Sequence, residues 1–539
     1  MTQSPQNNHL STMTSETNTM HLPKQYLITK QPVSALSGWR NIEYLGWCLS
    51  LAKEVPLVTV EDLDGNSIGR IVGWVIWQGK LLQDGDVIQS TNQTDGVAVE
   101  YDAFCGRFVY LYALHQQLAV ITDAGGMMSL VYSAELEAAA STPAVLQLIQ
   151  ELRFDQLTFD ALTAGSPKKW LPFGVTPYHG VARLLPNHRL TLSDWRVERI
   201  YPYSVSASNR NIDSIDSMDS IHSSAPYSCA SLIDGSDIDN VTGMIAGWVK
   251  QNVAALVHAG HNVAHLTGGV DSRMILAASR DLCDQMRFQT VSADDVGTRL
   301  DNHIAGRIAK KFGLNYSTLQ FQQPTDEEVH AWRQRTGYCV EDAVTQLCTT
   351  ARIHNNHCHE MTGTCGEALK SPYWYPGDEN LATLTTQGLL RRFEFPENDI
   401  TTRLAEAWIA EFPADISAGN LLDLAYIELR LGCWAGPSMF GHDISFPSIS
   451  PFNSARYYRA ILSVSEQVRA KGDLIPAVYR HLWPELLDTP FNRATGFAKL
   501  LFLSEEIRRM LPVEFKDQIK RIRSALHARK TRSSQRAQV

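Results

Sequence analysis

A glycine-rich turn that leads into an aspartate carries the clearest chemistry in the sequence. The run 267–272 reads Thr-Gly-Gly-Val-Asp-Ser and lies between an apolar segment and a helical stretch. Two adjacent glycines let backbone N–H groups approach an anion, and the following helix adds free N–H donors and its positive dipole end. Thr267 and Ser272 add hydroxyl donors, and Asp271 is suited to hold an Mg²⁺ ion that bridges the phosphate. The run predicts a phosphate cradle, although Gly and Asp also suit an ordinary strand-to-helix turn with an Asp cap.

Two apolar segments must position this turn. Residues 262–266 and 287–293 read as buried strands, and each is followed by a helical stretch. This alternation is typical of a parallel α/β sheet. In the second helical stretch, Ile304, Ile308 and Phe312 recur every four residues and predict one apolar face turned toward the sheet.

The turn resembles the S-G-G-x-D-S loop of the PP-loop ATP pyrophosphatases, which cleave ATP between its α and β phosphates to adenylate a substrate. A second segment, 361–374, is similar to the S-G-x-G-x-D-E segment of the asparagine synthetase family, which supplies a second acidic Mg²⁺ ligand and closes the ATP site. Thr362 and Gly363 match that segment. Cys365 stands where a glycine is usual, and Glu367 replaces the aspartate. Since Glu also binds Mg²⁺ through oxygen, the resemblance implies that Glu367 is the second metal ligand.

The N-terminal half resembles the class II glutaminase domain of the same family. The segments 106–132 and 180–192 carry this likeness, and the second contains the family's P-G-H turn as Pro186-Asn187-His188. Short β-branched and aromatic runs separated by Gly, Asp and Asn predict that this half is rich in strands. Together the likenesses cover most of residues 40–200 and 240–500.

One departure concerns the glutaminase nucleophile. Class II glutaminases use an N-terminal cysteine as nucleophile and base, whereas this position holds Thr2, followed by a polar tail, and the nearest cysteines are Cys48 and Cys105. The chain is similar in this respect to the β-lactam synthetases and the lasso-peptide macrolactam cyclases, which use an amine on the substrate itself. We therefore expect a glutaminase-shaped domain without glutaminase activity.

The resemblance implies an ATP-dependent ligase that forms an amide bond. A small-molecule or peptide carboxylate would attack the α-phosphate of ATP, expel pyrophosphate and become an acyl-adenylate, which ammonia or a substrate amine would convert to the amide. Mg²⁺ on Asp271 and Glu367, the amides of the glycine turn (Gly268, Gly269) and a basic side chain would neutralise charge on the leaving pyrophosphate. In this family adenine lies against the strand ends, so Leu266 and Val291 would supply backbone contacts.

A second departure concerns the family's catalytic lysine near the C-terminus, which has no clear counterpart. In the matching segment, 488–499, Arg493 is the first candidate and Lys499 the second. Two alternatives stay open beside the asparagine-synthetase-type ligase. One is a peptide or small-molecule tailoring ligase of the macrolactam or β-lactam synthetase kind. The other, of a different class, is a catalytically decayed nucleotide-binding scaffold.

Three further features have a plain structural interpretation beside a functional one. The segment 354–360 holds three histidines and a cysteine, which could suggest zinc, but a strand exposing alternate residues explains it without a metal. Arg273 either grips a phosphate or carboxylate bidentately or lies at the surface of the first helical turn. Glu428 and Arg430 are two residues apart and do not share a helical face, so at most one faces the site.

Composition bounds the remaining possibilities. The 539 residues are 44% hydrophobic and 19% charged, which provides ample apolar material for buried cores. The formal charge of −9 gives no basic excess that would indicate nucleic acid as a partner. Apolar runs are too short for a membrane helix, so no membrane partner is expected. Nine cysteines without paired C-x-x-C spacing favour reduced thiols and a cytoplasmic location.

The chain is predicted to divide into two domains. The first, 23–203, is a β-rich glutaminase-like sandwich with helices, and the second, 240–515, is a parallel-sheet α/β ATP-binding domain with a mostly helical C-terminal part. A Ser/Asp-rich linker or insertion, 204–239, separates them, because its composition cannot offset its ordering entropy. The ends are a disordered polar tail without a secretory signal, 1–22, and a basic tail, 516–539.

Overall fold

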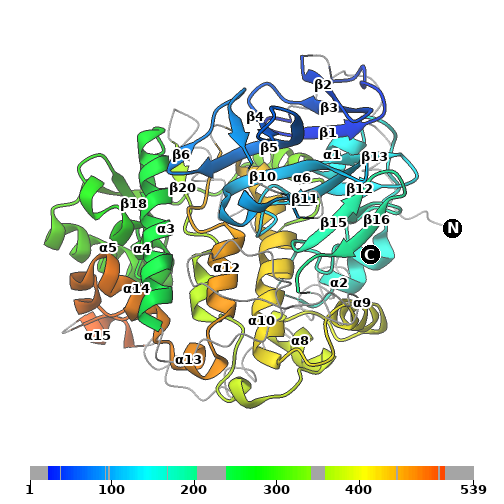
Figure 1. The fold of residues 1–539 in the computed structure, drawn as a ribbon. Coiled ribbons are helices and arrows are strands. Elements are labelled where there is room, and N and C mark those ends of the chain that lie inside the picture. Colours follow the sequence, from blue (N-terminus) through cyan, green and yellow to red (C-terminus); the bar gives the residue numbers. More distant parts are fainter. Residues whose placement is uncertain are drawn as a thin grey trace, which may run out of the picture.

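The computed structural model describes residues 22–36, 38–90, 93–94, 97–166, 168–202, 238–341, 359–444, 447–495 and 498–503. The predicted fold class is confirmed. Mostly antiparallel sheets come first, a four-stranded parallel sheet with helices follows, and the C-terminal part is largely helical (Figure 1). The predicted linker up to residue 237 and nearly all of both predicted tails lie outside the described residues.

Two sheets build the N-terminal part. The first has the order β14-β12-β13-β1-β3-β2 and is antiparallel throughout. The second has the order β16-β15-β11-β10-β5-β4-β7, with β6 paired to β5, and only β4 and β7 run parallel. The strands are Tyr26–Thr29 (β1), Arg40–Tyr44 (β2), Trp47–Leu51 (β3), Leu57–Glu61 (β4), Ser67–Trp77 (β5), Lys80–Leu81 (β6), Val87–Gln89 (β7), Cys105–Leu114 (β10), Gln117–Thr122 (β11), Val131–Ser133 (β12), Ala138–Ala140 (β13), Ala182–Arg183 (β14), His188–Thr191 (β15) and Arg196–Arg199 (β16), beside the small pair Gln93–Thr94 (β8) and Val97–Ala98 (β9).

Two glycines let the central strands β5 and β10 approach each other closely. Gly73 has φ +117° and Gly106 has φ +138°, and a Cβ on Gly106 would lie 2.2 Å from the carbonyl oxygen of Trp74. Only glycine fits both the backbone conformation and the space. The helices of this part are Val99–Ala103 (η1), Pro143–Leu146 (α1) and Gln156–Thr163 (α2).

The parallel sheet has the order β19-β18-β17-β20. Its elements are Ile238–His258 (α3), Val263–His265 (β17), Val270–Ala278 (α4), Arg280–Leu282 (η3), Arg287–Ser292 (β18), Val296–Phe312 (α5), Tyr316–Gln320 (β19), Asp326–Thr336 (α6) and Glu360–Met361 (β20). Ile304 and Ile308 of α5 are buried and Phe312 packs against the core, as the four-residue periodicity predicts. Because β17 and β20 are parallel neighbours, the segments that follow them meet at one edge of the sheet.

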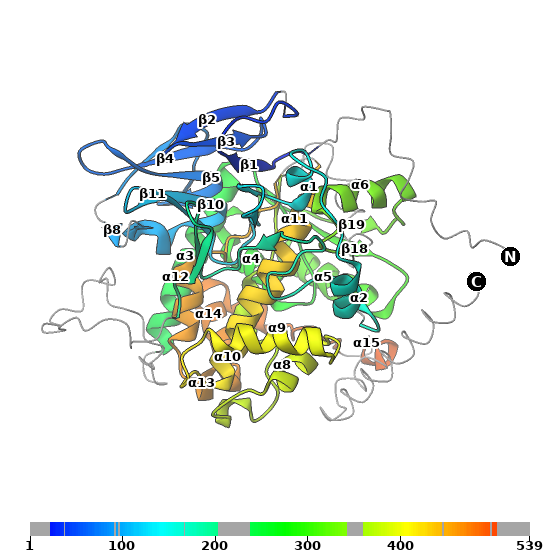
Figure 2. The ribbon, with the colours of Figure 1, turned by 90° about the vertical axis from the view of Figure 1, so that its right-hand side faces the viewer.

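Helices dominate the rest of the described chain and lie below the N-terminal sheets in the view of Figure 2. They are Gly366–Lys370 (η4), Asp378–Asn380 (η5), Thr386–Phe393 (α8), Asp399–Ala410 (α9), Ala418–Ala425 (α10), the π-helix Tyr426–Ala435 (η6), Gly436–His442 (α11), Ala455–Leu462 (α12), Glu466–Lys471 (α13), Leu474–Leu482 (α14), Pro484–Asp488 (η7) and Ala498–Leu501 (α15). Among the described helices, none combines the length and the apolar character that crossing a membrane requires.

Buried contacts join the N-terminal sheets to the C-terminal helices. Arg107 of β10 forms an ion pair of 2.7 Å with Asp443, and both side chains are buried. The rings of Trp170 and Phe395 meet edge to face, 4.9 Å between centroids. One continuous hydrophobic core includes residues from both parts, so the two predicted domains pack as one body.

Candidate functional site

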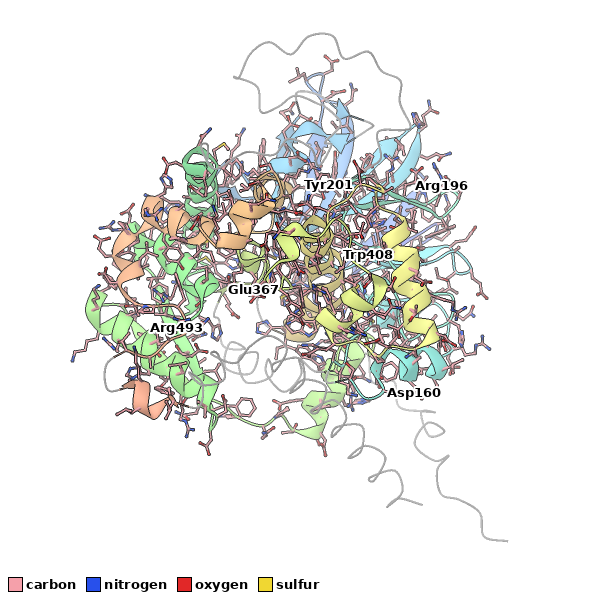
Figure 3. The ribbon with its side chains drawn as sticks, turned by 90° about the horizontal axis from the view of Figure 1, so that it is seen from below. Asp160, Arg196, Tyr201, Glu367, Trp408 and Arg493 are labelled. Atoms are coloured by element: carbon pink, nitrogen blue, oxygen red, sulfur yellow. The ribbon has the colours of Figure 1, made fainter. Side chains whose placement is uncertain are left out.

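Two acidic side chains converge at the carboxyl edge of the parallel sheet. Asp271 lies in the first turn of α4, just after β17, and Glu367 lies in η4, which follows β20. The Lys370 ammonium is 2.7 Å from Asp271 Oδ2 and 3.3 Å from Glu367 Oε1. Both carboxylates therefore contact the same cationic group. Glu367 lies near the middle of the molecule in the view of Figure 3.

Two glycines allow the segment after β20 to lie directly on α4. A Cβ on Gly363 would lie 3.3 Å from Asp271 Cβ, and a Cβ on Gly366 would lie 3.1 Å from the same atom. Thr362 contributes differently, because its hydroxyl bonds Thr364 Oγ1 at 2.8 Å and its N–H donates to the Ile449 carbonyl at 3.0 Å. Thr362 and Gly363 thus shape this segment.

The surroundings of Asp271 disfavour the charged form of its carboxyl group. Burial raises the pKa of Asp271 to about 6, Glu367 adds to this rise, and Lys370 opposes it. Burial would lower the pKa of Lys370, but Asp271 and Glu367 outweigh it and hold this pKa above its ordinary value. Oδ1 of Asp271 is buried and accepts no hydrogen bond from another described residue. A buried oxygen of this kind is available to a cation.

The amides of the glycine turn are engaged within the chain. Gly268 N–H donates to Asp301 Oδ1 at 2.8 Å, and Gly269 N–H donates to Thr267 Oγ1 at 3.1 Å. The hydroxyl of Ser272 accepts from Thr267 N–H at 3.0 Å. The predicted phosphate cradle uses the Gly268 N–H to bind an anion. Asp301 Oδ1 already accepts from this N–H, so a phosphate would have to displace the Asp301 side chain.

The two residues predicted to contact adenine lie at adjacent strand ends. Leu266 follows β17 and is fully buried, its N–H donates to Gln289 at 2.8 Å, and its carbonyl accepts from Thr290. Val291 lies in β18, and its carbonyl accepts from Asn302 Nδ2 at 3.1 Å. Their backbone groups therefore already have partners in the chain.

The segment expected to supply a basic group docks on the glycine turn. Asn492 N–H donates to the Gly268 carbonyl at 2.7 Å. Arg493 follows and is exposed, and Lys499 is exposed on α15. Within the described residues, neither side chain forms an ion pair with Asp271 or Glu367. The structure brings this segment to the turn but places Lys370, rather than Arg493 or Lys499, between the carboxylates.

Sequence reasoning missed Lys370. It is three residues after Glu367, a spacing that puts two side chains on one face of a helical turn. That local signal was available, because Gly366–Lys370 reads Gly-Glu-Ala-Leu-Lys. The contact with Asp271 depends on the pairing of β17 with β20, which sequence alone does not reveal.

Both interpretations of Arg273 are wrong. The side chain is completely buried, so it is no surface residue, and its guanidinium donates to the carbonyls of Leu486, Thr489 and Pro490 rather than facing a ligand. The guanidinium also stacks over the ring of Phe491, 4.2 Å from the centroid. Arg273 therefore anchors the segment that carries Asn492 onto α4.

Replacement of Arg273 by Met is expected to loosen this segment. The variant leaves the buried carbonyl of Leu486 and the part-buried carbonyls of Thr489 and Pro490 without their donor, which costs about 3 kcal/mol in the free energy of unfolding. Chemical denaturation measures the loss, and hydrogen exchange should show faster exchange confined to residues 484–495. Arg273→Lys is the matched control and should recover part of the loss. Unchanged exchange in Arg273→Met would contradict this role.

Cys365 adopts a backbone conformation that favours glycine. Its φ is +81°, in the left-handed region that side chains disfavour. The same is true of Asn187 in the Pro-Asn-His turn, whose φ is +63°. Cys365 and Asn187 thus both adopt a left-handed backbone conformation in their turns.

Glu428 serves the joint between the two parts of the chain. Its carboxylate is buried and accepts from Asn187 Nδ2 at 2.9 Å, from both terminal nitrogens of Arg199 and from Trp408 Nε1 at 2.9 Å. Arg430 lies over the ring of Trp434. Glu428 and Arg430 therefore contact different residues, as their two-residue spacing predicts. Glu428 contacts the Pro-Asn-His turn.

The histidine-rich segment falls mostly outside the described residues, because 354–358 are among those not described. His359 Nδ1 lies 3.4 Å from His261 Nε2. Among the described residues, no three His, Cys, Asp or Glu side chains are grouped to hold a metal ion. Two carboxylates are nevertheless enough for Mg²⁺, which commonly binds one or two carboxylates together with substrate phosphates.

Asp423, a buried acid that contacts the residue after Lys370, makes the free energy of unfolding depend on pH. Asp423 accepts from Ser371 Oγ at 3.2 Å and pairs with Arg469. Burial raises the pKa of Asp423 to about 6 although Arg469 opposes the rise. Between about pH 4 and pH 6, Asp423 is therefore protonated in the folded chain and charged in the unfolded chain. The free energy of unfolding consequently falls as pH rises through this window.

Asp423→Asn removes this titration. The stability of the wild type relative to Asp423→Asn should fall by on the order of 3 kcal/mol between pH 4 and pH 7. Denaturant unfolding of both proteins across this range measures the difference. Parallel pH profiles for the two proteins would contradict the assignment.

Comparisons with known proteins identify no relative: no family model matches the chain, and a search of the curated proteins finds no match. The function is therefore argued from the site.

Proposed function

We propose that the chain is an ATP-dependent ligase that forms an amide bond through an acyl-adenylate. The observation that carries this proposal is the convergence of Asp271 and Glu367 on one cation position beside a glycine turn at the carboxyl edge of a parallel sheet. Ligands of open α/β sheets bind at this edge. The resemblance of both segments to the asparagine synthetase family supplies the reaction class.

The residues present fit an Mg²⁺ ion. Asp271 offers a buried oxygen without a partner among the described residues, and Glu367 is 44% exposed and able to turn. When bound there, the ion would neutralise negative charge on the pyrophosphate leaving group. Lys370 pairs with both carboxylates.

The chain's own groups then have separate tasks. The helix α4 begins directly after the turn, so its first-turn N–H groups and dipole would receive the phosphates. The Lys370 ammonium, released from the two carboxylates, would bind phosphate oxygens and supply the positive charge that the family obtains from its lysine. Gly268 N–H would exchange Asp301 for a phosphate oxygen.

The amine is expected to come from ammonia or from the substrate rather than from glutamine. Cys48 and Cys105 are both buried in strands, and burial raises the pKa of Cys105 well above its ordinary value. A thiol of this kind is no nucleophile, since the thiolate is the reactive form. Thr2 lies outside the described residues. An asparagine-forming ligase and a macrolactam or β-lactam-type cyclase share this requirement, and the acyl donor distinguishes them.

A non-catalytic nucleotide-binding scaffold is the second candidate. It is favoured by the two intramolecular contacts that occupy the site, Lys370 between the carboxylates and Asp301 on the Gly268 amide. In that case both contacts would persist and no turnover would follow.

Pyrophosphate release tests the proposal. Purified protein with ATP and Mg²⁺ is assayed across carboxylic acids that include aspartate and short peptides, with Asp271→Ala beside the wild type. We expect release with one class of acid and its loss in the variant. A silent panel with intact ATP binding would favour the scaffold, and absence of ATP binding would reject both candidates.

A further inference from the structure

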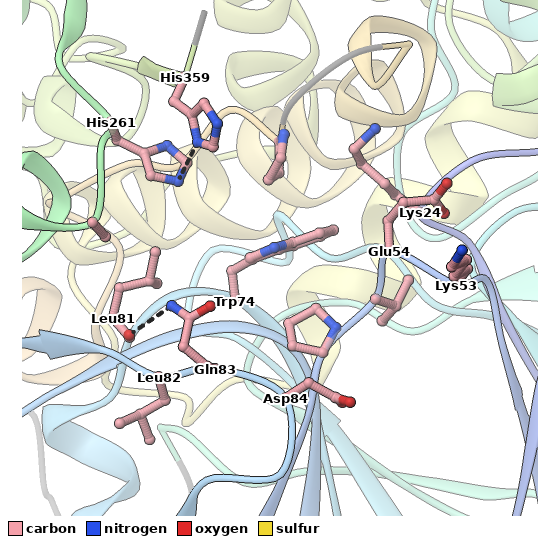
Figure 4. Close-up of a pocket in the computed structure, with 14 residues that line it drawn as sticks. Lys24, Lys53, Glu54, Trp74, Leu81, Leu82, Gln83, Asp84, His261 and His359 are labelled. Carbon is pink, nitrogen blue, oxygen red and sulfur yellow. Dashed lines mark hydrogen bonds between the residues drawn. The ribbon is translucent and has the colours of Figure 1, made fainter. Parts of the chain in front are cut away.

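A cavity of about 320 Å³ lies between the N-terminal sheets and the parallel sheet (Figure 4). His261 and His359 line it where they precede β17 and β20, so the cavity lies at the amino edge of the parallel sheet. Asp271 and Glu367 follow the same strands at the opposite, carboxyl edge. The cavity is thus separate from the proposed ligase site. Its volume is at the lower end of the range for small-molecule pockets.

A buried ammonium forms one side of the cavity. Lys24 is 3% exposed, and its Nζ donates to the carbonyl of Asp443 at 3.0 Å. The carboxylate of Asp443 is paired with Arg107. An ammonium has three donors, and no other acceptor for Nζ is found among the described residues. Buried donors without acceptors are costly, so an anionic oxygen in the cavity would satisfy them.

The other residues that line the cavity indicate which chemical group would carry this anion. The ring of Trp74 lies between the Lys24 side and the histidine side in Figure 4 and offers a flat apolar surface. His261 is bonded to His359 across perpendicular rings. Burial lowers the pKa of His261 to about 3, with a smaller effect of His359, so His261 is a neutral polar group at physiological pH. His261 therefore adds no charge to this side of the cavity.

The local charge favours a monoanion. Glu54 also lines the cavity beside Lys24, and Lys53 lies next to it in sequence. Asp84 also lines the cavity, and its charge is balanced by Arg40, 2.7 Å away. Lys24, Lys53 and Glu54 then leave one positive charge. A doubly charged phosphate would meet the repulsion of Glu54, whereas a single carboxylate balances the site.

We propose that this cavity binds a small organic carboxylate with a planar apolar body, whose carboxylate accepts hydrogen bonds from Lys24 and whose ring lies along Trp74. The proposal is independent of the ligase reaction, because neither the nucleotide turn nor the carboxylate pair takes part.

Three fluorinated probes of one shape and different charge test it by ¹⁹F NMR titration of the full chain without ATP. The probes are 4-fluorophenylacetate, 4-fluorophenethylamine and 4-fluorophenyl phosphate. We expect the carboxylate alone to bind with saturation. Lys24→Met should weaken its binding about tenfold or more, as one lost charge-assisted hydrogen bond predicts. Lys24→Arg should retain it, because the charge and the donors remain.

Two control variants show whether the probe binds in this cavity. Lys310→Met changes an exposed lysine on α5 and should leave binding unchanged, as should Asp271→Asn, which disables the proposed ligase site. If Lys24→Met does not fold, as judged by circular dichroism, Trp74→Leu provides the second test and should weaken binding of the same probe. Equal binding of amine and carboxylate, tighter binding of the phosphate, no binding of the carboxylate, or unchanged binding in Lys24→Met would overturn the proposal.

Discussion

Asp271→Asn is expected to lower the rate of ATP-dependent pyrophosphate release at least about 100-fold, because it removes one of two charges that would hold the metal at the leaving group. The substitution keeps the size of the side chain, so the first turn of α4 should persist. The measurement is kcat/KM for pyrophosphate release with the acyl donor that the panel identifies.

Two controls accompany this variant. Asp301→Asn keeps a side chain that can bond the Gly268 amide and removes the charge that competes with phosphate, so it should not reduce ATP affinity. Lys310→Met changes an exposed residue on α5 and should leave the rate within about twofold, since exposed substitutions away from special features have small effects. A rate in Asp271→Asn equal to that of the wild type would contradict the role of Asp271.

Lys370→Met is expected to have two opposite effects. Without the ammonium, the two carboxylates lose their counter-charge, so they should bind a divalent cation more tightly in the absence of nucleotide, by about tenfold. The rate of pyrophosphate release should fall by about tenfold to 100-fold, because the positive charge for the phosphates is lost. Electron paramagnetic resonance with Mn²⁺ as the probe measures the first effect, and the pyrophosphate assay measures the second.

The conservative variant decides whether the charge matters. Lys370→Arg keeps the charge and should keep Mn²⁺ binding weak, whereas Glu367→Gln in the Lys370→Met background should weaken the gained Mn²⁺ binding. Identical Mn²⁺ affinity in the wild type and in Lys370→Met would mean that Lys370 does not occupy the cation position.

The parts of the site that sequence predicts are those fixed by local structure. A strand, a glycine turn and a helix are consecutive in the chain, so Asp271 could be placed at a helix start before any tertiary contact was known. The alternation of strands and helices likewise predicted the parallel sheet, and the periodicity of Ile304, Ile308 and Phe312 predicted the buried face of α5.

The parts that sequence missed depend on contacts between distant segments. Arg273 was assigned either to a ligand or to the surface, because nothing local indicates that residues 486–490 fold back onto α4. Asp301 lies in α5, and its contact with Gly268 N–H joins two segments that are not adjacent in the sequence. The contact of Lys370 with Asp271 depends on the strand order that puts β20 beside β17. Local pattern does not contain strand order.

The most direct test of the central claim is ATP–pyrophosphate exchange without an amine. Labelled pyrophosphate, ATP, Mg²⁺ and the candidate carboxylic acids are incubated with the wild type, with Lys310→Met and with Asp271→Asn. Reversible formation of an acyl-adenylate predicts that label enters ATP in the first two proteins, depends on the carboxylic acid, and is absent with Asp271→Asn. Bound ATP without exchange, or exchange that persists in Asp271→Asn, would contradict the claim.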